Sequence, residues 1–168
     1  MADLRPLRFL VVDDNPHMLK IVRTILNAFS VTNIYEALSA LEALEIARNE
    51  AIDIIITDYQ MDGMNGVQLI KSLRDQNKVA NPLVPIIMLS AYSEKSRVFE
   101  ARDAGSTEFC CKPVTAKDLF AKISMIIDRP RPFVRTKVYF GPDRRRHDPS
   151  KYRGPERRSD DEAKPNVA

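Results

Sequence analysis

The chain has 168 residues, a formal net charge of +3 and two cysteines, which are neighbours at positions 110 and 111. This length suits one domain with an appendage, and the longest apolar runs are far too short to span a membrane. The first eight residues lack the apolar stretch of a secretory signal, and adjacent cysteines cannot staple a fold, so we expect a reducing, cytoplasmic setting.

The charge is divided unevenly along the chain. Residues 1–128 contain 14 Lys and Arg and 17 Asp and Glu, a net charge of −3. Residues 129–168 contain 12 Lys and Arg and 6 Asp and Glu, a net charge of +6, together with many prolines and few aliphatic residues. We therefore predict a globular body over 1–128 and a basic, Pro- and Arg-rich tail over 129–168, which is either flexible or draped over the body.

Short apolar runs alternate five times with amphipathic segments along the body. The runs are nearly continuous in apolar character, which is typical of parallel strands covered on both faces. The predicted strands are about 8–12, 31–35, 52–57, 85–89 and 108–111, the last including Cys110 and Cys111 as small core residues. The predicted helices begin at Asn15-Pro16 and after Gly66, and span about Ser39–Asn49, Lys95–Ala104 and Ala116–Ile127. This alternation predicts an α/β fold with a doubly wound parallel sheet, while the strand order stays open.

Three acidic residues follow two of these strands. Asp13 and Asp14 come directly after the first strand, and Asp58 comes directly after the apolar run of the third. In an alternating β/α chain the carboxyl ends of the strands border the crevice where ligands bind. Grouped carboxylates repel one another and resist burial, and the usual compensation is a hard cation with oxygen ligands, such as Mg²⁺.

The residue types at this edge suggest phosphoryl transfer. Asp58 is the best-placed nucleophile, because a carboxylate that ends a central strand can attack phosphorus and form an aspartyl phosphate. Mg²⁺ held by Asp13 and Asp14 would relieve the repulsion between the two anions. Lys112 and Ser90, at the ends of the fifth and fourth strands, would offer a positive charge and a hydroxyl to the phosphate oxygens.

This ordered set of residues resembles the receiver domain of two-component response regulators, the CheY-like family, over about residues 7–128. The match rests on Val11-Val12-Asp13-Asp14-Asn15, on Ile56-Thr57-Asp58 with Met61 and Gly66 after it, on Leu89-Ser90-Ala91, and on Phe109-Cys110-Cys111-Lys112-Pro113. The gaps of 44, 32 and 22 residues between Asp14, Asp58, Ser90 and Lys112 also fit the family.

The resemblance implies a flavodoxin-like (βα)5 fold with strand order 2-1-3-4-5. It implies that Asp58 accepts a phosphoryl group from a histidine kinase or a histidine phosphotransfer protein. Asp13, Asp14 and Asp58 would hold Mg²⁺, with the backbone carbonyl of Gln60 as a further ligand. Lys112 would contact the phosphoryl group, and the bond between Lys112 and Pro113 would be cis.

The resemblance also implies a signalling switch. Ser90 would move toward the phosphoryl group and Phe109 would change rotamer behind it. That shift would reshape the face formed by the fourth helix, the fifth strand and the fifth helix for a downstream protein target. The implied function is a single-receiver response regulator, a phosphoprotein with self-phosphorylation and self-dephosphorylation chemistry only.

An enzyme is the competing interpretation of the same acids. Phosphohydrolases with an Asp nucleophile typically carry a second acid two residues later as general acid and base. Gln60 stands at that position here, which argues against efficient turnover.

The tail contains a repeated motif. Residues Tyr139–Arg145 recur as Tyr152–Arg158, an offset of 13 residues. Three interpretations stay open: a solvated basic tail, a docking motif for a protein partner, and a surface for nucleic acid or membrane. The arginines that would contact anions are Arg144, Arg145, Arg146, Arg157 and Arg158. Nucleic-acid binding is the least favoured, because acidic residues interrupt these arginines and no helix-turn-helix pattern fits.

Overall fold

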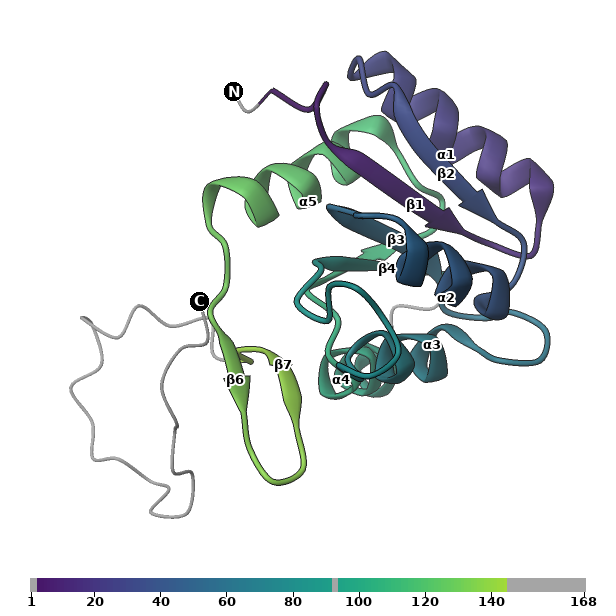
Figure 1. The fold of residues 1–168 in the computed structure, drawn as a ribbon. Coiled ribbons are helices and arrows are strands. Elements are labelled where there is room, and N and C mark those ends of the chain that lie inside the picture. Colours follow the sequence, from purple (N-terminus) through teal and green to yellow (C-terminus); the bar gives the residue numbers. More distant parts are fainter. Residues whose placement is uncertain (1–2, 92–93, 145–168) are drawn as a thin grey trace.

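The structure is a computed structural model that describes residues 3–91 and 94–144. One sheet of five parallel strands runs through it in the order β2-β1-β3-β4-β5, which confirms the predicted fold (Figure 1). The strands are β1 (Arg8–Val12), β2 (Asn33–Ala37), β3 (Ile54–Asp58), β4 (Ile86–Ser90) and β5 (Glu108–Cys111). The helices are α1 (Pro16–Ala28), α2 (Ala40–Asn49), α3 (Gly66–Leu73), α4 (Lys95–Ala104) and α5 (Ala116–Asp128).

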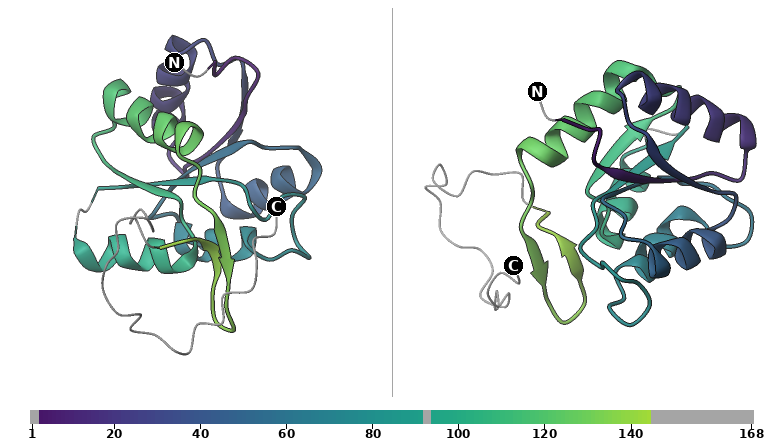
Figure 2. Two further views of the ribbon diagram at one scale, coloured as in Figure 1. Left: turned by 90° about the vertical axis from the view of Figure 1, so that its left-hand side faces the viewer. Right: turned by 45° about the horizontal axis from the view of Figure 1, so that its top comes forward.

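Helices cover both faces of the sheet (Figure 2). Helices α1 and α5 supply Leu26 and Ile123 to the core on one face, while α2, α3 and α4 supply Ala43, Ile70 and Ala101 to the core on the other. Every residue of β3 and β4 is therefore buried. This double coverage is the physical reason that the strands appear in the sequence as unbroken apolar runs.

Local signals fix the helix ends. Helix α1 begins after Asn15, whose side chain accepts a hydrogen bond from the backbone N–H of His17 at 2.9 Å, and Pro16 occupies its first position. Helix α4 ends at Gly105, which has a left-handed φ of +110°. None of the helices in the described residues is long and apolar enough to cross a membrane.

The sequence analysis was wrong in some details of the strands. Strands β2 and β3 each begin two residues later than predicted, at Asn33 and Ile54. Cys110 is buried as expected, but Cys111 is exposed. The reason is that β5 lies at the edge of the sheet and successive side chains of a strand point to opposite faces.

A small hairpin follows α5, and the sequence analysis did not predict it. Strands β6 (Phe133–Arg135) and β7 (Phe140–Pro142) pair antiparallel. The hairpin lies beside the end of α4, on the side of the sheet where the strands begin (Figures 1 and 2). The tail was predicted to be either flexible or draped over the body. Residues 129–144 lie over the body. The predicted tail arginines Arg145, Arg146, Arg157 and Arg158 lie outside the described residues.

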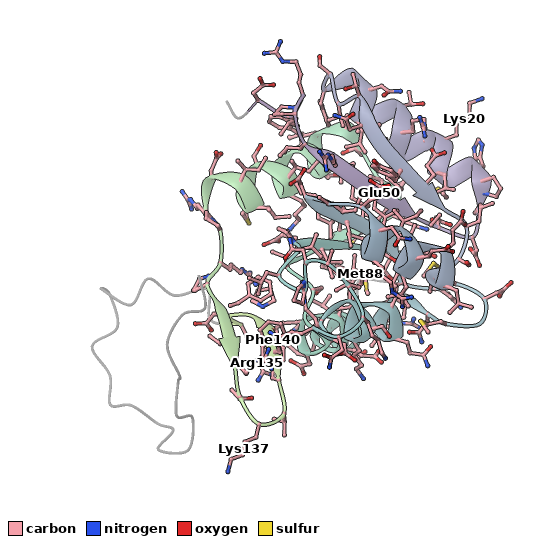
Figure 3. The ribbon with its side chains drawn as sticks, in the orientation of Figure 1. Lys20, Glu50, Met88, Arg135, Lys137 and Phe140 are labelled. Atoms are coloured by element: carbon pink, nitrogen blue, oxygen red, sulfur yellow. The ribbon has the colours of Figure 1, made fainter. Side chains whose placement is uncertain are left out.

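The side chains of the hairpin divide between its outer tip and the body. Figure 3 shows Lys137 pointing away from the body at the tip, and Arg135 lying against Phe140. The guanidinium of Arg135 is 4.1 Å from the centre of the Phe140 ring. The ring of Phe133 packs against the same Phe140 ring, with 5.8 Å between their centres, and also covers the guanidinium of Arg74 at 5.0 Å. The hairpin therefore closes over a cationic side chain of the body.

Arg74, which caps the end of α3, is a buried cation held by backbone carbonyls. Its guanidinium donates two hydrogen bonds to the carbonyl of Gly105, at 2.8 and 3.0 Å, and one each to Pro82 and Val84, at 2.8 and 2.6 Å. Burial lowers the pKa of Arg74 to about 9. These carbonyls precede β4 and β5. Arg74 therefore ties α3 to the loops at the end of the sheet where the strands begin.

Candidate functional site

The predicted site residues lie together at the opposite end of the sheet, where the strands end. Val12 and Thr57 are partners in the parallel register of β1 and β3, so Asp13 and Asp58 follow side by side. Both carboxylates are buried, at 3% and 6% exposure. The ammonium of Lys112, just after β5, lies 2.8 Å from Oδ1 of Asp58 and 3.2 Å from Oδ2 of Asp13. One cation thus bridges two buried anions from distant parts of the chain.

Asp14 completes an acidic cluster that fits a metal ion. Asp13, Asp14 and Asp58 each offer one carboxylate oxygen within 4.8 Å of the others, and Asp14 is exposed to solvent. The carboxylate of Asp14 also accepts a hydrogen bond from the backbone N–H of Asp62 at 3.0 Å, which ties it to the loop after β3. An oxygen-only donor set at the mouth of a cavity suits Mg²⁺, which uses few carboxylates and keeps waters.

A cavity opens beside this cluster. Its lining comprises Asp58, Tyr59, Gln60, Ser90, Ala91 and Lys112. Ser90 is the last residue of β4, and its carbonyl accepts a hydrogen bond from the backbone N–H of Lys112 at 2.7 Å. Gln60 is exposed in the loop after β3. The structure therefore places both residues at the site, while the metal-ligand role of the Gln60 carbonyl stays a prediction.

Phe109 and Pro113 lie near Lys112, a lining residue of this cavity, in the sequence. The Phe109 ring is half-buried in β5 and packs against the core on the α2, α3 and α4 face. It lies opposite Met88, two residues before Ser90, in the register of β4 and β5. The peptide bond between Lys112 and Pro113 is cis. The switch role of Ser90 and Phe109 stays a prediction.

Burial and the opposite charges at the site shift the pKa values of Asp58 and Lys112. Burial raises the pKa of Asp58, and the hydrogen bond and positive charge of Lys112 only partly oppose this effect. Burial alone would lower the pKa of Lys112, but its hydrogen bond with Asp58 and the charges of Asp58 and Asp13 raise it overall. The ammonium therefore stays charged at neutral pH, ready to face an added anion.

Replacing Asp58 with asparagine is expected to raise the midpoint of thermal unfolding by a few degrees at neutral pH in the presence of a chelator. Because the folded pKa of Asp58 lies above the ordinary value of 3.8, the folded chain binds a proton at pH values where the unfolded chain has lost it. Stability therefore falls as pH rises from the unfolded pKa through the folded pKa, and Asp58→Asn lacks this loss. Thermal melts between about pH 4 and about pH 8 should show the advantage of the variant growing with pH. An advantage that shrinks with pH would contradict this assignment.

Gly66 allows the first turn of α3 to approach β3 closely. A Cβ at this position would lie 2.2 Å from the backbone carbonyl oxygen of Asp58, closer than any side chain tolerates. The sequence analysis treated Gly66 as the residue before the third helix and as part of the family pattern, not as a site of close packing. The close approach itself depends on how α3 packs on β3, which no local sequence pattern specifies.

Sequence reasoning also missed a link between the site and α4. The hydroxyl of Tyr59, the residue after Asp58, is hydrogen-bonded to the carboxylate of Glu100. The guanidinium of Arg97 lies 5.0 Å from the centre of the Tyr59 ring. These residues are exposed or half-exposed and about 40 positions apart, so neither hydrophobic periodicity nor a motif could have indicated the contact.

Comparisons with known proteins agree with this geometry. The family model of the response regulator receiver domain matches residues 9–124. The chain is 32% identical over 123 residues to the chemotaxis protein CheY-3 of Vibrio cholerae, covering 73% of this chain and 93% of that protein. It is 31% identical to the chemotaxis protein CheY of Pseudomonas aeruginosa over 123 residues, which cover 73% of this chain and 98% of that protein.

Solved structures show the same likeness. The chemotaxis protein CheY4 of Vibrio cholerae, crystallised at low pH, superposes with a TM-score of 0.66 at 26% identity, covering 71% of this chain and 98% of that chain. A CheY-like response regulator receiver domain protein from Methanospirillum hungatei gives a TM-score of 0.65 at 27% identity, covering 73% of this chain and 94% of that chain. The chain therefore belongs to the family of response regulator receiver domains of two-component systems.

Proposed function

We propose that this chain is a single-receiver response regulator that accepts a phosphoryl group on Asp58 from a histidine kinase or a histidine phosphotransfer protein. The observation that carries the proposal is the position of the Lys112 ammonium, 2.8 Å from Asp58 and 3.2 Å from Asp13 at the edge of a cavity. A carboxylate, a fixed positive charge and a group of carboxylate oxygens that could hold a metal ion lie together there, which supports phosphoryl transfer.

The proposed chemistry uses the residues in distinct roles. A carboxylate oxygen of Asp58 attacks phosphorus, a P–O bond forms as the P–N bond to the donor imidazole breaks, and the imidazole leaves with the bonding electron pair. Lys112 balances the charge of a phosphoryl oxygen, and the Ser90 hydroxyl donates a hydrogen bond to another. Asp13, Asp14 and Asp58 would hold Mg²⁺, which supplies charge neutralisation when bound.

The expected output is protein contact in the cytoplasm rather than catalysis. Asp58 keeps the phosphoryl group until water removes it, because the position two residues later is Gln60, which has no acid to drive turnover. The signal would reach a downstream target through the face of α4, β5 and α5 or through the basic tail. The contact of Tyr59 with Glu100 and Arg97 favours α4 as the first element to respond.

Incubation with acetyl phosphate and Mg²⁺ tests the proposal. Intact mass measurement should show one added phosphoryl group on the wild-type chain, because the small donor replaces the phosphohistidine of the partner. Asp58→Ala and an excess of chelator should each abolish the addition. Asp62→Ala is the matched control, since Asp62 is an exposed acid four residues away whose backbone, not its carboxylate, contacts Asp14.

Two outcomes would contradict the proposal. A phosphoryl group that persists in Asp58→Ala would show that another residue is the acceptor. Multiple turnovers of small phosphate esters by the wild-type chain would favour a phosphohydrolase instead.

A further inference from the structure

The repeated motif of the tail can be interpreted from its first copy, Tyr139–Arg145. The described part of this copy folds into a compact turn around the Tyr139 ring, which is only 8% exposed. The Tyr139 hydroxyl donates a hydrogen bond to the carbonyl of Pro142 at 2.7 Å. The guanidinium of Arg144 lies 4.5 Å from the centre of the same ring. Tyrosine, proline and arginine thus hold one another in place within the motif.

Gly141 presses this turn against the body. A Cβ on Gly141 would lie 3.0 Å from the Cα of Gly105 and 2.6 Å from the Tyr139 hydroxyl. Gly105 is itself confined, because a Cβ there would lie 3.3 Å from the carbonyl oxygen of Phe140. The two backbones therefore meet at a glycine-to-glycine contact that larger residues would separate.

An ion pair completes the docking. The guanidinium of Arg144 lies 3.0 Å from Oδ1 of Asp103, two residues before Gly105. We name the surface formed by Asp103 and Gly105 the Gly105 corner. A ligand for this corner needs a backbone without Cβ, an arginine three residues later, and a tyrosine that supports both.

The second copy, Tyr152–Arg158, retains each of these features. Tyr152, Gly154, Pro155 and Arg157 stand at the positions of Tyr139, Gly141, Pro142 and Arg144. Over the stretch that matches Tyr139–Arg144, the second copy has one non-conservative difference, which is Arg153 in place of Phe140. The Phe140 ring packs on Phe133 at 5.8 Å and on Arg135 at 4.1 Å, which belong to β6 and not to the corner. Arginine at this position lacks the packing of the Phe140 ring on β6, while the tyrosine, glycine, proline and arginine of the motif are all present in the second copy.

We propose that residues 152–158 are a second ligand for the Gly105 corner and occupy it when the first copy is displaced. Sixteen residues, 136–151, connect β6 to the second copy, a span that reaches roughly 50 Å when extended. The corner of the same chain is therefore within reach, and tethering favours it over the corner of another molecule. The first copy holds the corner at rest because only it adds the packing of Phe140 on β6.

Matched glycine variants of the full chain test this exchange. The amide resonance of Gly105 in ¹⁵N-labelled protein reports the occupant, because the docked motif lies against its Cα. Gly154→Ala should leave this resonance at its wild-type position. Gly141→Ala should move it by less than half of the shift seen in the double variant Gly141→Ala with Gly154→Ala, in which both ligands are blocked. Ser150→Ala, between the copies, is the control for changes in the tail without effect on docking.

The other outcomes would overturn the proposal. Equal shifts in Gly141→Ala and in the double variant would mean that the second copy does not bind the corner. A resonance that stays in place in all three variants would mean that the glycine contact does not hold the motif. Light scattering on Gly141→Ala distinguishes the source of the ligand: a monomer supports exchange within one chain, and a dimer would show docking between molecules, contrary to the proposal. Arg144→Ala and Arg157→Ala, singly and together, should reproduce the pattern if alanine at the glycines perturbs the turn itself.

Discussion

Replacing Arg74 with alanine is expected to lower the free energy of unfolding by about 3–5 kcal/mol, the largest stability loss that we predict for a residue outside the apolar core. The guanidinium is buried and satisfies the carbonyls of Gly105, Pro82 and Val84 with four hydrogen bonds. Alanine would leave these carbonyls without their donors and open a cavity under Phe133. Urea unfolding followed by far-UV circular dichroism measures the change.

Two further substitutions separate geometry from charge at this position. Arg74→Lys should recover only part of the loss, because an ammonium cannot reproduce the planar fork that reaches three carbonyls. Arg48→Ala is the matched control: Arg48 is an exposed arginine on α2 that donates to the carbonyl of Lys78, and its loss should stay within about 0.5 kcal/mol. An Arg74→Ala variant as stable as Arg48→Ala would show that the buried guanidinium does not hold these loops together.

Replacing Lys112 with alanine is expected to slow phosphorylation by acetyl phosphate about 10²- to 10³-fold. Its ammonium already lies 2.8 Å from the carboxylate that would attack phosphorus, so it is placed to balance charge that develops on a phosphoryl oxygen. The initial rate of mass increase in excess Mg²⁺ gives the effect directly. Lys117→Ala is the control, because Lys117 is an exposed lysine five residues along the chain, in the first turn of α5.

The arginine variant makes this test more specific. Lys112→Arg keeps the positive charge but replaces a compact point charge with a wide fork, so it should remain at least about tenfold slower than wild type. A rate for Lys112→Ala within about threefold of wild type would show that the ammonium has only a structural role, and the proposed mechanism would lose its central electrostatic element.

The sheet and its acidic edge were predictable because their causes are local in the sequence. Strands buried on both faces must be apolar throughout, so β3 and β4 stood out as runs. The polar residues that end these strands, Asp58 and Ser90, then lie at one end of the sheet because parallel strands all end there. The strand order itself came from the family resemblance and not from the pattern.

The unpredicted features depend on contacts between residues that are far apart in the chain. Arg74 looks in the sequence like any surface arginine at a helix end, and only the loops from Pro82 to Val84 and at Gly105 make it a buried one. Strands β6 and β7 are three residues each, with Pro132 before the first and Pro142 at the end of the second, so they are too short for a periodic signal. Tertiary packing decides both cases, and local propensity carries no information about it.

The separation of the two ends of the sheet has a consequence for how such a molecule can be altered. The tail docks where the strands begin and the acids gather where they end, roughly 17 Å apart for strands of five residues. We therefore expect additions after Arg144, beyond the contacts of Phe133 and Arg144 with the body, to leave the phosphoryl transfer proposed for Asp58 unchanged. The choice of partner that we propose for the tail and the reaction that we propose for Asp58 can then evolve as two independent traits of one small protein.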